Sequence, residues 1–359
     1  MKNLGIIIVT YQSERHIAPL LRSLAATIDR AQTVVMVWDN ASSDATLAVI
    51  EQERPALGLD LRVITSKVNA GFMRGNNAAC AALQNETPCE VIALLNPDTV
   101  AHEGWWQPLV TALENPRVGT VASLLLLPDG TVNSCGNALH FLGLGFVQNY
   151  GEAIAQFPAN PTLFSGSGAA LAFRPGTLEA MNAKLGLTGI FWEELFLYAD
   201  DTDLGWRMRM VGLENTLALE SRVTHDHRFW LQPLGALGDR MFYLERNRYL
   251  LMLANFKIAT LLLLIPWLAA SEIALALGVW KLYPRRIDLW RAVIKEARTS
   301  AFRSRRQKLQ AGRTVPDRII LRAMTGSIRH GGIPFRGMDQ LLDAGLRWSH
   351  GLLCGLVQW

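Results

Sequence analysis

The chain has 359 residues, of which 50% are hydrophobic and 18% are charged. This composition excludes a disordered polypeptide and provides core residues for about two domains. Charge is unevenly distributed: residues 1–230 carry 15 Lys and Arg against 23 Asp and Glu, whereas residues 231–359 carry 20 against 8. We therefore expect two regions with different roles, an acidic first region and a basic second region.

The cysteines and the N-terminal sequence favour a cytosolic protein. The four cysteines form no C-x-x-C pair and no tight cluster, which argues against a zinc module and a disulfide scaffold. The apolar run 4–9 is too short for the core of a signal peptide, and no cleavage pattern follows it. We expect a reducing environment and no export of the first region.

Alternating strands and helices are predicted for most of the first region. Continuous apolar, β-branched runs predict buried strands, and helical patterns lie between them. We expect strands at 4–10, 33–38, 61–65 and 91–95, and helices at 13–28, 43–53 and 75–84. This order predicts an α/β fold with a Rossmann-like, mostly parallel sheet flanked by helices, and a ligand site beyond the carboxyl ends of the strands.

The pattern is less regular from residue 118 onward. Strands are expected at 121–127 and 163–173, the second with internal glycines that mark a close approach of the backbone to another group. A helix is expected at 201–211, with Gly212 directly after its end.

The second region, residues 231–359, is predicted to be helical and to associate with a membrane. Residues 249–283 are dominated by Leu, Ala, Ile and Trp, and a basic stretch follows. The 23 residues between Lys257 and Lys281 are long enough to span a bilayer, but they include Pro266 and Glu272. Interfacial helices are therefore expected instead of a spanning helix; a soluble helical subdomain or a dimer interface is the alternative. Nucleic-acid binding is not expected, because the basic residues follow an apolar stretch and not aromatic stacking positions.

Polar residues follow three of the predicted strands. The pairs Thr10-Tyr11 and Asp39-Asn40 and the triplet Asn96-Pro97-Asp98 are expected to converge at one edge of the sheet. Asp98 can bind a divalent cation through its oxygens, or it can belong to an ordinary turn. Asp39 can bind a ribose or a base edge, or it can cap a helix.

Two further clusters carry candidate functional residues. The loop 69–77 combines glycines with Arg74 before a helix, which suits an anion but also fits a plain turn and cap. Residues 200–203 read Asp-Asp-Thr-Asp. Repulsion between these carboxylates, together with partial burial, can raise the pKa of one of them and make it a general base. The alternative is that the acids cap the helix that begins here. His225 can ligate a metal together with Asp98, or it can be an ordinary histidine.

Together these stretches resemble the inverting family 2 glycosyltransferases, and most closely their rhamnosyltransferase-like bacterial members. The similar stretches occur in the family's order over about residues 1–228. They are IIVTYQSE (7–14), VWDNASSD (37–44), NAGF (69–72) with GNN (75–77), LLNPD (94–98), SGSGA (165–169) and FLYADDTDL (196–204) with Arg207.

The resemblance implies a GT-A fold, a nucleotide-sugar donor and a divalent metal, Mg²⁺ or Mn²⁺. Its site residues fall into three groups in this sequence. They are Thr10, Tyr11, Glu14, Asp39, Asn69, Gly71, Arg74 and Asn96 for the nucleotide sugar, Asp98 and His225 for the metal, and Asp201 as the catalytic base with Asp200 beside it. Two positions depart from the family pattern: Asn96 replaces the first acid of D-x-D, and Asp200 replaces the more usual Glu. The second departure leaves open which carboxylate reaches the acceptor.

The expected reaction moves a sugar to a hydroxyl with inversion. The donor is expected to be dTDP-rhamnose, and the acceptor a lipid-linked or polysaccharide glycan of the cell envelope, at the cytoplasmic face of the inner membrane. A homo-oligomer is compatible with this expectation. The alternatives are a UDP-hexose or galactofuranose donor, or a membrane-bound scaffold that binds a nucleotide sugar without turnover.

Overall fold

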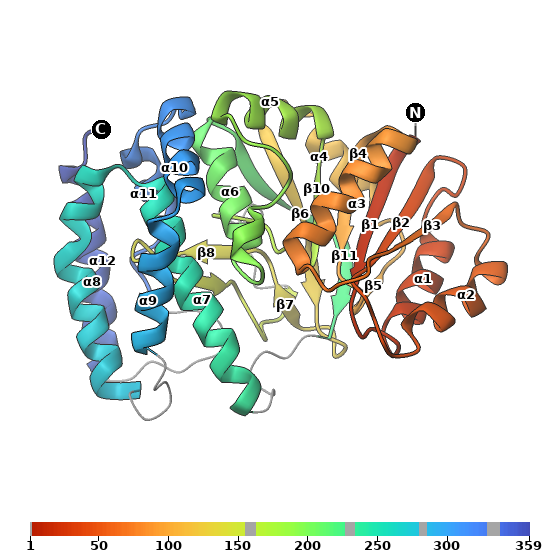
Figure 1. Cartoon of the computed structure of the whole chain (residues 1–359), viewed down its shortest axis with the longest axis horizontal. Coiled ribbons are helices and arrows are strands. Elements are labelled where there is room, and N and C mark those ends of the chain that lie inside the picture. The colour runs from red at the N-terminus through yellow and green to blue at the C-terminus, as the bar shows by residue number, and fades with distance from the viewer. Residues whose placement is uncertain (1, 155–162, 227–233, 280–285, 329–337) are drawn as a thin grey trace.

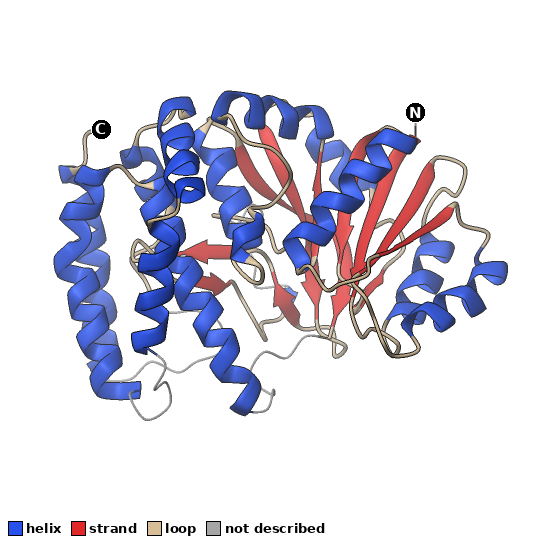
Figure 2. Cartoon of the chain, viewed as in Figure 1, coloured by secondary structure: helices blue, strands red, loops and turns tan. Residues whose placement is uncertain are grey.

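A nine-stranded sheet forms the centre of the first region, with helices on both of its faces (Figures 1 and 2). The computed structural model describes residues 2–154, 163–226, 234–279, 286–328 and 338–359. Across the sheet the strands are β3 (Leu61–Thr65), β2 (Thr33–Asp39), β1 (Lys2–Thr10), β4 (Cys89–Leu95), β10 (Ala170–Phe173), β6 (Val118–Leu126), β11 (Glu214–His225) and β5 (Thr99–Ala101), with β7 (Val132–Ser134) paired to β6. A separate pair is formed by β8 (Asn137–Leu139) and β9 (Gly145–Val147).

The sheet is mostly parallel, as predicted. Strands β1 to β4 run parallel, β6 and β11 run parallel to each other, and β10 is antiparallel to its neighbours β4 and β6. The carboxyl ends of the parallel strands therefore share one edge with the segment that enters β10. The predicted polar strand ends and the glycine-rich run 165–169 meet at this edge.

The apolar runs reflect a sheet that is covered on both faces. Successive residues of β1 enter different cores: Ile6 and Ile8 belong to one hydrophobic cluster, and Ile7 belongs to the other. Neither face of such a strand is exposed to solvent, so its sequence is a continuous apolar run and does not alternate between apolar and polar residues. One face is covered by α1 (Ile17–Thr27), α2 (Thr46–Leu57) and α4 (Gln107–Leu113), and the other by α3 (Phe72–Glu86), α5 (Pro175–Leu185) and α6 (Asp200–Met210).

The strand predicted at 163–173 was wrong in its first half. Only Ala170–Phe173 forms a strand, and Ser165 contributes an isolated bridge to Asn137. Glycines at 166 and 168 weaken strand formation, and Gly168 lies against the carboxylate of Asp200. The predicted helix end was correct: α6 stops at Met210, and Gly212 has φ +84°.

The described part of the second region is helical and packs against the first. Its helices are α7 (Leu234–Asn255), α8 (Ile258–Val279), α9 (Arg286–Ala297), α10 (Ser300–Gly312), α11 (Asp317–Ala323) and α12 (Met338–Leu356). The two regions share one hydrophobic core, in which Trp206 of α6 meets Phe256 with ring centroids 4.9 Å apart. The predicted boundary near residue 230 lies outside the described residues. Pro266 and Glu272 lie within α8, and in the described ranges no helix has the length and apolarity needed to cross a membrane.

Candidate active site

Thr10 and Asp39 end neighbouring strands and bind each other. Thr10 Oγ1 donates a hydrogen bond to Asp39 Oδ1 at 2.8 Å, and Ser42 donates to both carboxylate oxygens, through Oγ at 2.6 Å and through its backbone N–H at 2.9 Å. Both Thr10 and Asp39 are fully buried. Tyr11 is 51% exposed, and it is therefore the side chain at this strand end that a ligand can reach directly.

The predicted Glu14 lies in a loop that is cross-linked to the loop after β2. Its Oε2 accepts a hydrogen bond from the backbone N–H of Ala45 at 3.1 Å. Beside it, Gln12 accepts from the N–H groups of Ser43 and Asp44 through one side-chain oxygen. Gln12 has φ 53°, an uncommon value for a residue other than glycine. The sequence analysis passed over Gln12, because its only signal is its place between Tyr11 and Glu14.

The loop at 69–71 is fixed from two sides. Asn69 Oδ1 accepts from the N–H of Gly71 at 3.0 Å, and Asn40 Nδ2 donates to the carbonyl oxygen of Gly71 at 3.0 Å. Gly71 has φ +90°, and a Cβ at this position would lie 2.8 Å from the ring of Phe196. Only glycine fits here, so the loop lies directly against the segment that precedes Asp200.

Arg74 forms an ion pair that the sequence did not predict. Its Nε donates to Glu193 Oε2 at 2.9 Å, and the other oxygen of Glu193 accepts from Asn77 at 3.1 Å. Both partners of the ion pair are exposed to solvent, and pairs of this kind contribute about 1 kcal/mol or less. An anionic ligand can therefore compete with Glu193 for Arg74.

Asp98 and His225 come together, although 126 residues lie between them in the sequence. Asp98 Oδ1 lies 3.4 Å from His225 Nε2. His225 Nδ1 contacts Asn133 Oδ1 at 3.1 Å, and this contact orients the imidazole ring. A metal-ligating histidine is usually fixed by such a second hydrogen bond.

These residues fit a divalent cation that also binds the phosphates of a ligand. In the described parts of the chain, no three His, Cys, Asp or Glu side chains cluster as a complete metal site. Mg²⁺ is often bound by one or two carboxylates together with substrate phosphates and water. Asn96 Oδ1 is buried and has no hydrogen-bond partner among the described residues, which adds an oxygen of the required chemistry.

Asp200 and Asp201 begin α6 beside Gly168. Asp201 Oδ2 accepts from Asn137 Nδ2 at 2.8 Å and from the N–H of Gly168 at 3.3 Å. A Cβ at Gly168 would lie 2.8 Å from Asp200 Oδ2, so the glycine makes room for the pair. Sequence analysis missed Asn137, whose one signal is its position directly after Gly136.

The two carboxyl groups have raised pKa values. Burial, reinforced by the neighbouring Asp201, raises the pKa of Asp200 to about 8. Burial also raises the pKa of Asp201, although the hydrogen bonds from Gly168 and Thr202 oppose it. Interacting carboxyls of this kind titrate as a pair, and at neutral pH the pair holds a proton.

Replacing Asp200 with asparagine is expected to stabilise the protein at neutral and alkaline pH. Because the pKa of Asp200 is raised on folding, the stability that this group contributes is complete below about pH 4 and is lost as the pH rises through about 8. Asparagine undergoes no such loss. The gain in unfolding free energy over the wild type should therefore grow from about pH 4 and level off above about 8. Urea titrations across this range measure it, with the exposed Asp129→Asn as control; equal stabilities at high pH would contradict the expectation.

Asp203 differs from its neighbours because two guanidinium groups neutralise it. Its carboxylate pairs with Arg207 at 2.7 Å and with Arg305 of α10 at 2.9 Å. Burial alone would raise the pKa of Asp203, but the two arginines outweigh burial and lower it. Asp203 is therefore a structural anion that ties α6 to the second region.

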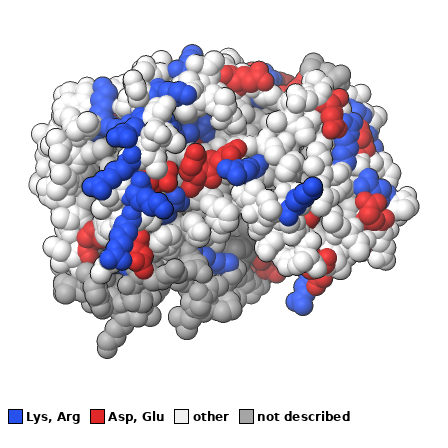
Figure 3. Space-filling view, viewed as in Figure 1, with Lys and Arg blue, Asp and Glu red and all other residues white. Residues whose placement is uncertain are grey.

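The surface around the site is charged, and a separate groove is apolar. In Figure 3, acidic side chains gather near the middle of the face, and basic ones lie over α9 and α10.

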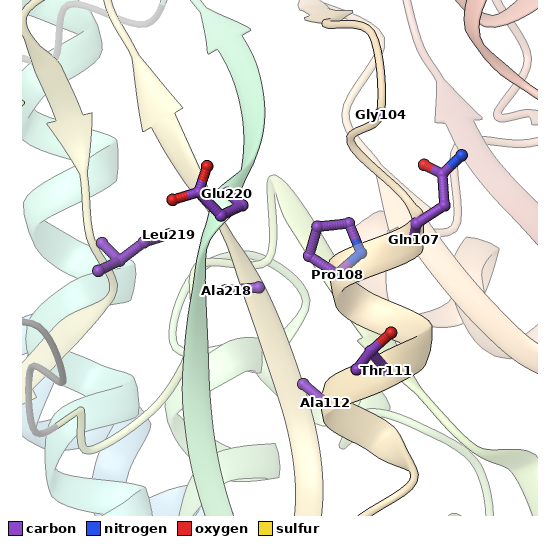
Figure 4. A pocket seen from close by; sticks show the side chains of 8 residues that line it. All are labelled: Gly104, Gln107, Pro108, Thr111, Ala112, Ala218, Leu219 and Glu220. Atoms are coloured by element: carbon purple, nitrogen blue, oxygen red, sulfur yellow. The ribbon is translucent and has the colours of Figure 1, made fainter.

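The groove in Figure 4 has a volume of about 510 Å³ and lies between α4 and the middle of β11. Glu220 is the one titratable residue that lines it among the described residues. Since His225 lies five residues farther along β11, this groove is not part of the candidate site.

Comparisons with known proteins indicate a glycosyltransferase. Residues 5–180 match the family model for glycosyl transferase family 2. The chain is 26% identical over 239 residues to the N-acetylglucosaminyl-diphospho-decaprenol L-rhamnosyltransferase of Mycobacterium tuberculosis, covering 62% of this chain and 75% of the relative.

Two solved structures share the fold. GalNAc-T7 with UDP, GalNAc and Mn²⁺ superposes with a TM-score of 0.55 at 14% identity, covering 72% of this chain and 49% of that one. Mannosyltransferase PcManGT from Pyrobaculum calidifontis, in complex with GDP-Man and Mn²⁺, superposes with a TM-score of 0.50 at 18% identity, covering 86% and 85%. These likenesses confirm the predicted GT-A type of fold. Over residues 5–180, the chain is similar to glycosyl transferase family 2.

Proposed function

We propose that the protein transfers a sugar, with inversion, from a nucleoside diphosphate sugar to a hydroxyl group of an acceptor. The observation that carries the proposal is the shared sheet edge. There the acid pair of α6 lies against Gly168, and Gly71 of the loop 69–71 contacts Phe196, four residues before that pair. A base and a donor loop that are this close can act on opposite faces of one anomeric carbon.

In this proposal each group of residues has a separate task. The nucleotide end is lined by Tyr11, Glu14 and Asp39, and Asp39 acts through the loop that it fixes. The sugar diphosphate is held by Asn69, Gly71, Arg74 and Asn96. Asp98 and His225 would hold Mg²⁺ or Mn²⁺, which offsets the charge of the departing diphosphate when bound. Asp201 takes the proton of the acceptor hydroxyl, and Asn137 keeps its carboxylate oriented.

We further propose dTDP-rhamnose as the donor and a lipid-linked or polysaccharide acceptor in cell-envelope glycan synthesis. The name of the Mycobacterium tuberculosis relative, a rhamnosyltransferase with a decaprenol-linked acceptor, supports both choices. A UDP-hexose or galactofuranose donor is the alternative within the same reaction class. A scaffold that binds the donor without turnover is the alternative outside it.

A donor panel tests this proposal. The purified protein is incubated with Mn²⁺, a polyprenyl-diphosphate sugar acceptor and dTDP-, UDP- or GDP-sugars, and release of the nucleoside diphosphate is measured. We expect release from dTDP-rhamnose that depends on the acceptor. Turnover of UDP-sugars with no turnover of dTDP-rhamnose would favour the alternative donor, and donor binding without any turnover would favour the scaffold.

The second region, residues 231–359 in our proposed division, would attach the enzyme to the cytoplasmic face of the inner membrane. On α8, Ile258, Leu262 and Ile265 are more than half exposed and recur at helical spacing; on α12, Leu341 and Trp348 are at least 70% exposed. This apolar surface, together with the basic charge of the region, suits anionic lipid. Sedimentation with liposomes of anionic and of neutral lipid tests the attachment, and failure to bind anionic liposomes at low salt would refute it.

A further inference from the structure

The segment 195–199, directly before Asp200, has a backbone conformation that needs support from elsewhere. Phe196, Tyr198 and Ala199 have φ values of 65°, 64° and 63°. Side chains with a Cβ rarely adopt this region, and such residues persist only where their surroundings hold them. Three of them within four residues make this the most strained stretch next to the candidate site.

Asn247 of α7 binds this segment. Its side chain is fully buried, and Nδ2 lies 3.1, 2.8 and 3.0 Å from the carbonyl oxygens of Leu195, Leu197 and Tyr198. An amide has two hydrogens, so the three carbonyls share them. The neighbouring Arg246 donates to the carbonyl of Glu194 at 3.1 Å and to Asn247 Oδ1 at 3.0 Å, which fixes the direction of the amide.

Both halves of the candidate site depend on the segment that Asn247 holds. After the segment, the chain continues directly into Asp200 and Asp201. Within it, Phe196 packs its ring and its carbonyl group against Gly71 of the donor loop. A change in the backbone at 195–199 would therefore move the acid pair relative to the donor loop.

We propose that Asn247 is a positioning residue for catalysis: it holds segment 195–199 in its strained conformation and thereby sets the distance between the acid pair and the donor loop. The proposal rests on the proposed glycosyl transfer, because the acid pair is given its role there. It assigns to the second region a task at the reacting centre that is separate from membrane attachment.

The chain offers a matched control for the test. Asn255 is also fully buried on α7, but neither its Nδ2 nor its Oδ1 has a hydrogen-bond partner among the described residues. Asn247→Leu and Asn255→Leu therefore each remove one buried amide from the same helix. Only Asn247→Leu also removes the hydrogen bonds to segment 195–199. Thermal unfolding, donor affinity by calorimetry, turnover, and amide hydrogen exchange of both full-length variants are compared with the wild type.

We expect Asn247→Leu to lower kcat by about 10²-fold, since a displacement of about 1 Å at a reacting centre has effects of this size. Donor affinity should change less than about threefold, and amide exchange at 195–204 should accelerate while exchange in β1 and β4 stays the same. Asn255→Leu should leave kcat and exchange at 195–204 unchanged.

Equal effects of the two variants on kcat, or unchanged exchange at 195–204 in Asn247→Leu, would overturn the proposal. If Asn247→Leu does not fold, Asn247→Ser, which is smaller and keeps one donor, takes its place with the same expected order of effects. If the wild type turns over no donor, the proposed function fails, and hydrogen exchange still decides whether Asn247 holds the segment.

Discussion

Replacing Asp201 with asparagine is expected to reduce kcat by about 10²- to 10⁴-fold, the usual loss when a general base is removed. Asparagine has nearly the same size, and its side-chain oxygen can still accept from Asn137 and from the N–H of Gly168, as the carboxylate does. It cannot take a proton. Donor affinity should therefore stay nearly unchanged, because the acid pair is assigned to the acceptor. Steady-state kinetics and calorimetry with the donor measure the two quantities.

Asp200→Asn is the matched control, one residue away in the same helix turn. Asn137 Nδ2 and the N–H of Gly168 both donate to Asp201 Oδ2, and such hydrogen bonds favour the ionised form that a base requires. We expect replacement of Asp200 to affect kcat less than Asp201→Asn does. The opposite order would make Asp200 the base. Loss of donor binding in both variants would move the pair to the metal site instead.

Chelation of divalent cations is expected to abolish turnover, and Asp98→Ala is expected to weaken donor binding in the presence of Mn²⁺. Without Asp98 the proposed cation would lose its carboxylate ligand, and His225 Nε2 would lose the neighbour that lies 3.4 Å away. Disturbing groups behind the metal ligands already lowers metal affinity by about 10- to 100-fold, so loss of a direct ligand should cost at least as much. Calorimetry with the donor, with and without Mn²⁺, measures the effect.

Asp129→Ala controls for removal of an acid from a turn after a strand. Asp129 follows β6, is exposed, and accepts hydrogen bonds from Thr131. We expect it to bind donor like the wild type. Full turnover in excess chelator would assign the diphosphate charge to Arg74 and other basic side chains and would remove the metal from the mechanism.

The sheet could be predicted from the sequence because its strands are buried on both faces. β3 has the predicted bounds, and β1, β2 and β4 differ from prediction by at most two residues at either end. Continuous apolar runs are a local signal, and so are the polar residues that follow them. The pairing of Asp98 with His225 was implied by the resemblance alone, because the strand β11 that carries His225 was not predicted to reach that residue.

The supporting contacts of the site could not be predicted, because they join residues that are far apart in the sequence. Asn137 reaches Asp201 across 64 positions, Asn247 reaches Leu197 across 50, and Glu193 reaches Arg74 across 119. None of these three residues belongs to a periodic pattern. The incorrect strand at 163–169 has a similar origin, because Gly168 makes room for Asp200, which belongs to another element.

The ion pair between Asp203 and Arg305 limits how this enzyme can be shortened or recombined. A fragment that ends near residue 230 would lose Arg305, whose guanidinium also lies over the ring of Trp192 at 4.3 Å, and would uncover Trp206 where Phe256 now packs. A fully buried carboxylate would then keep one cationic partner in place of two, at the first turn of α6. Chimeras that exchange C-terminal regions between relatives in order to redirect acceptor choice should therefore carry α7 and α10 together with the first region.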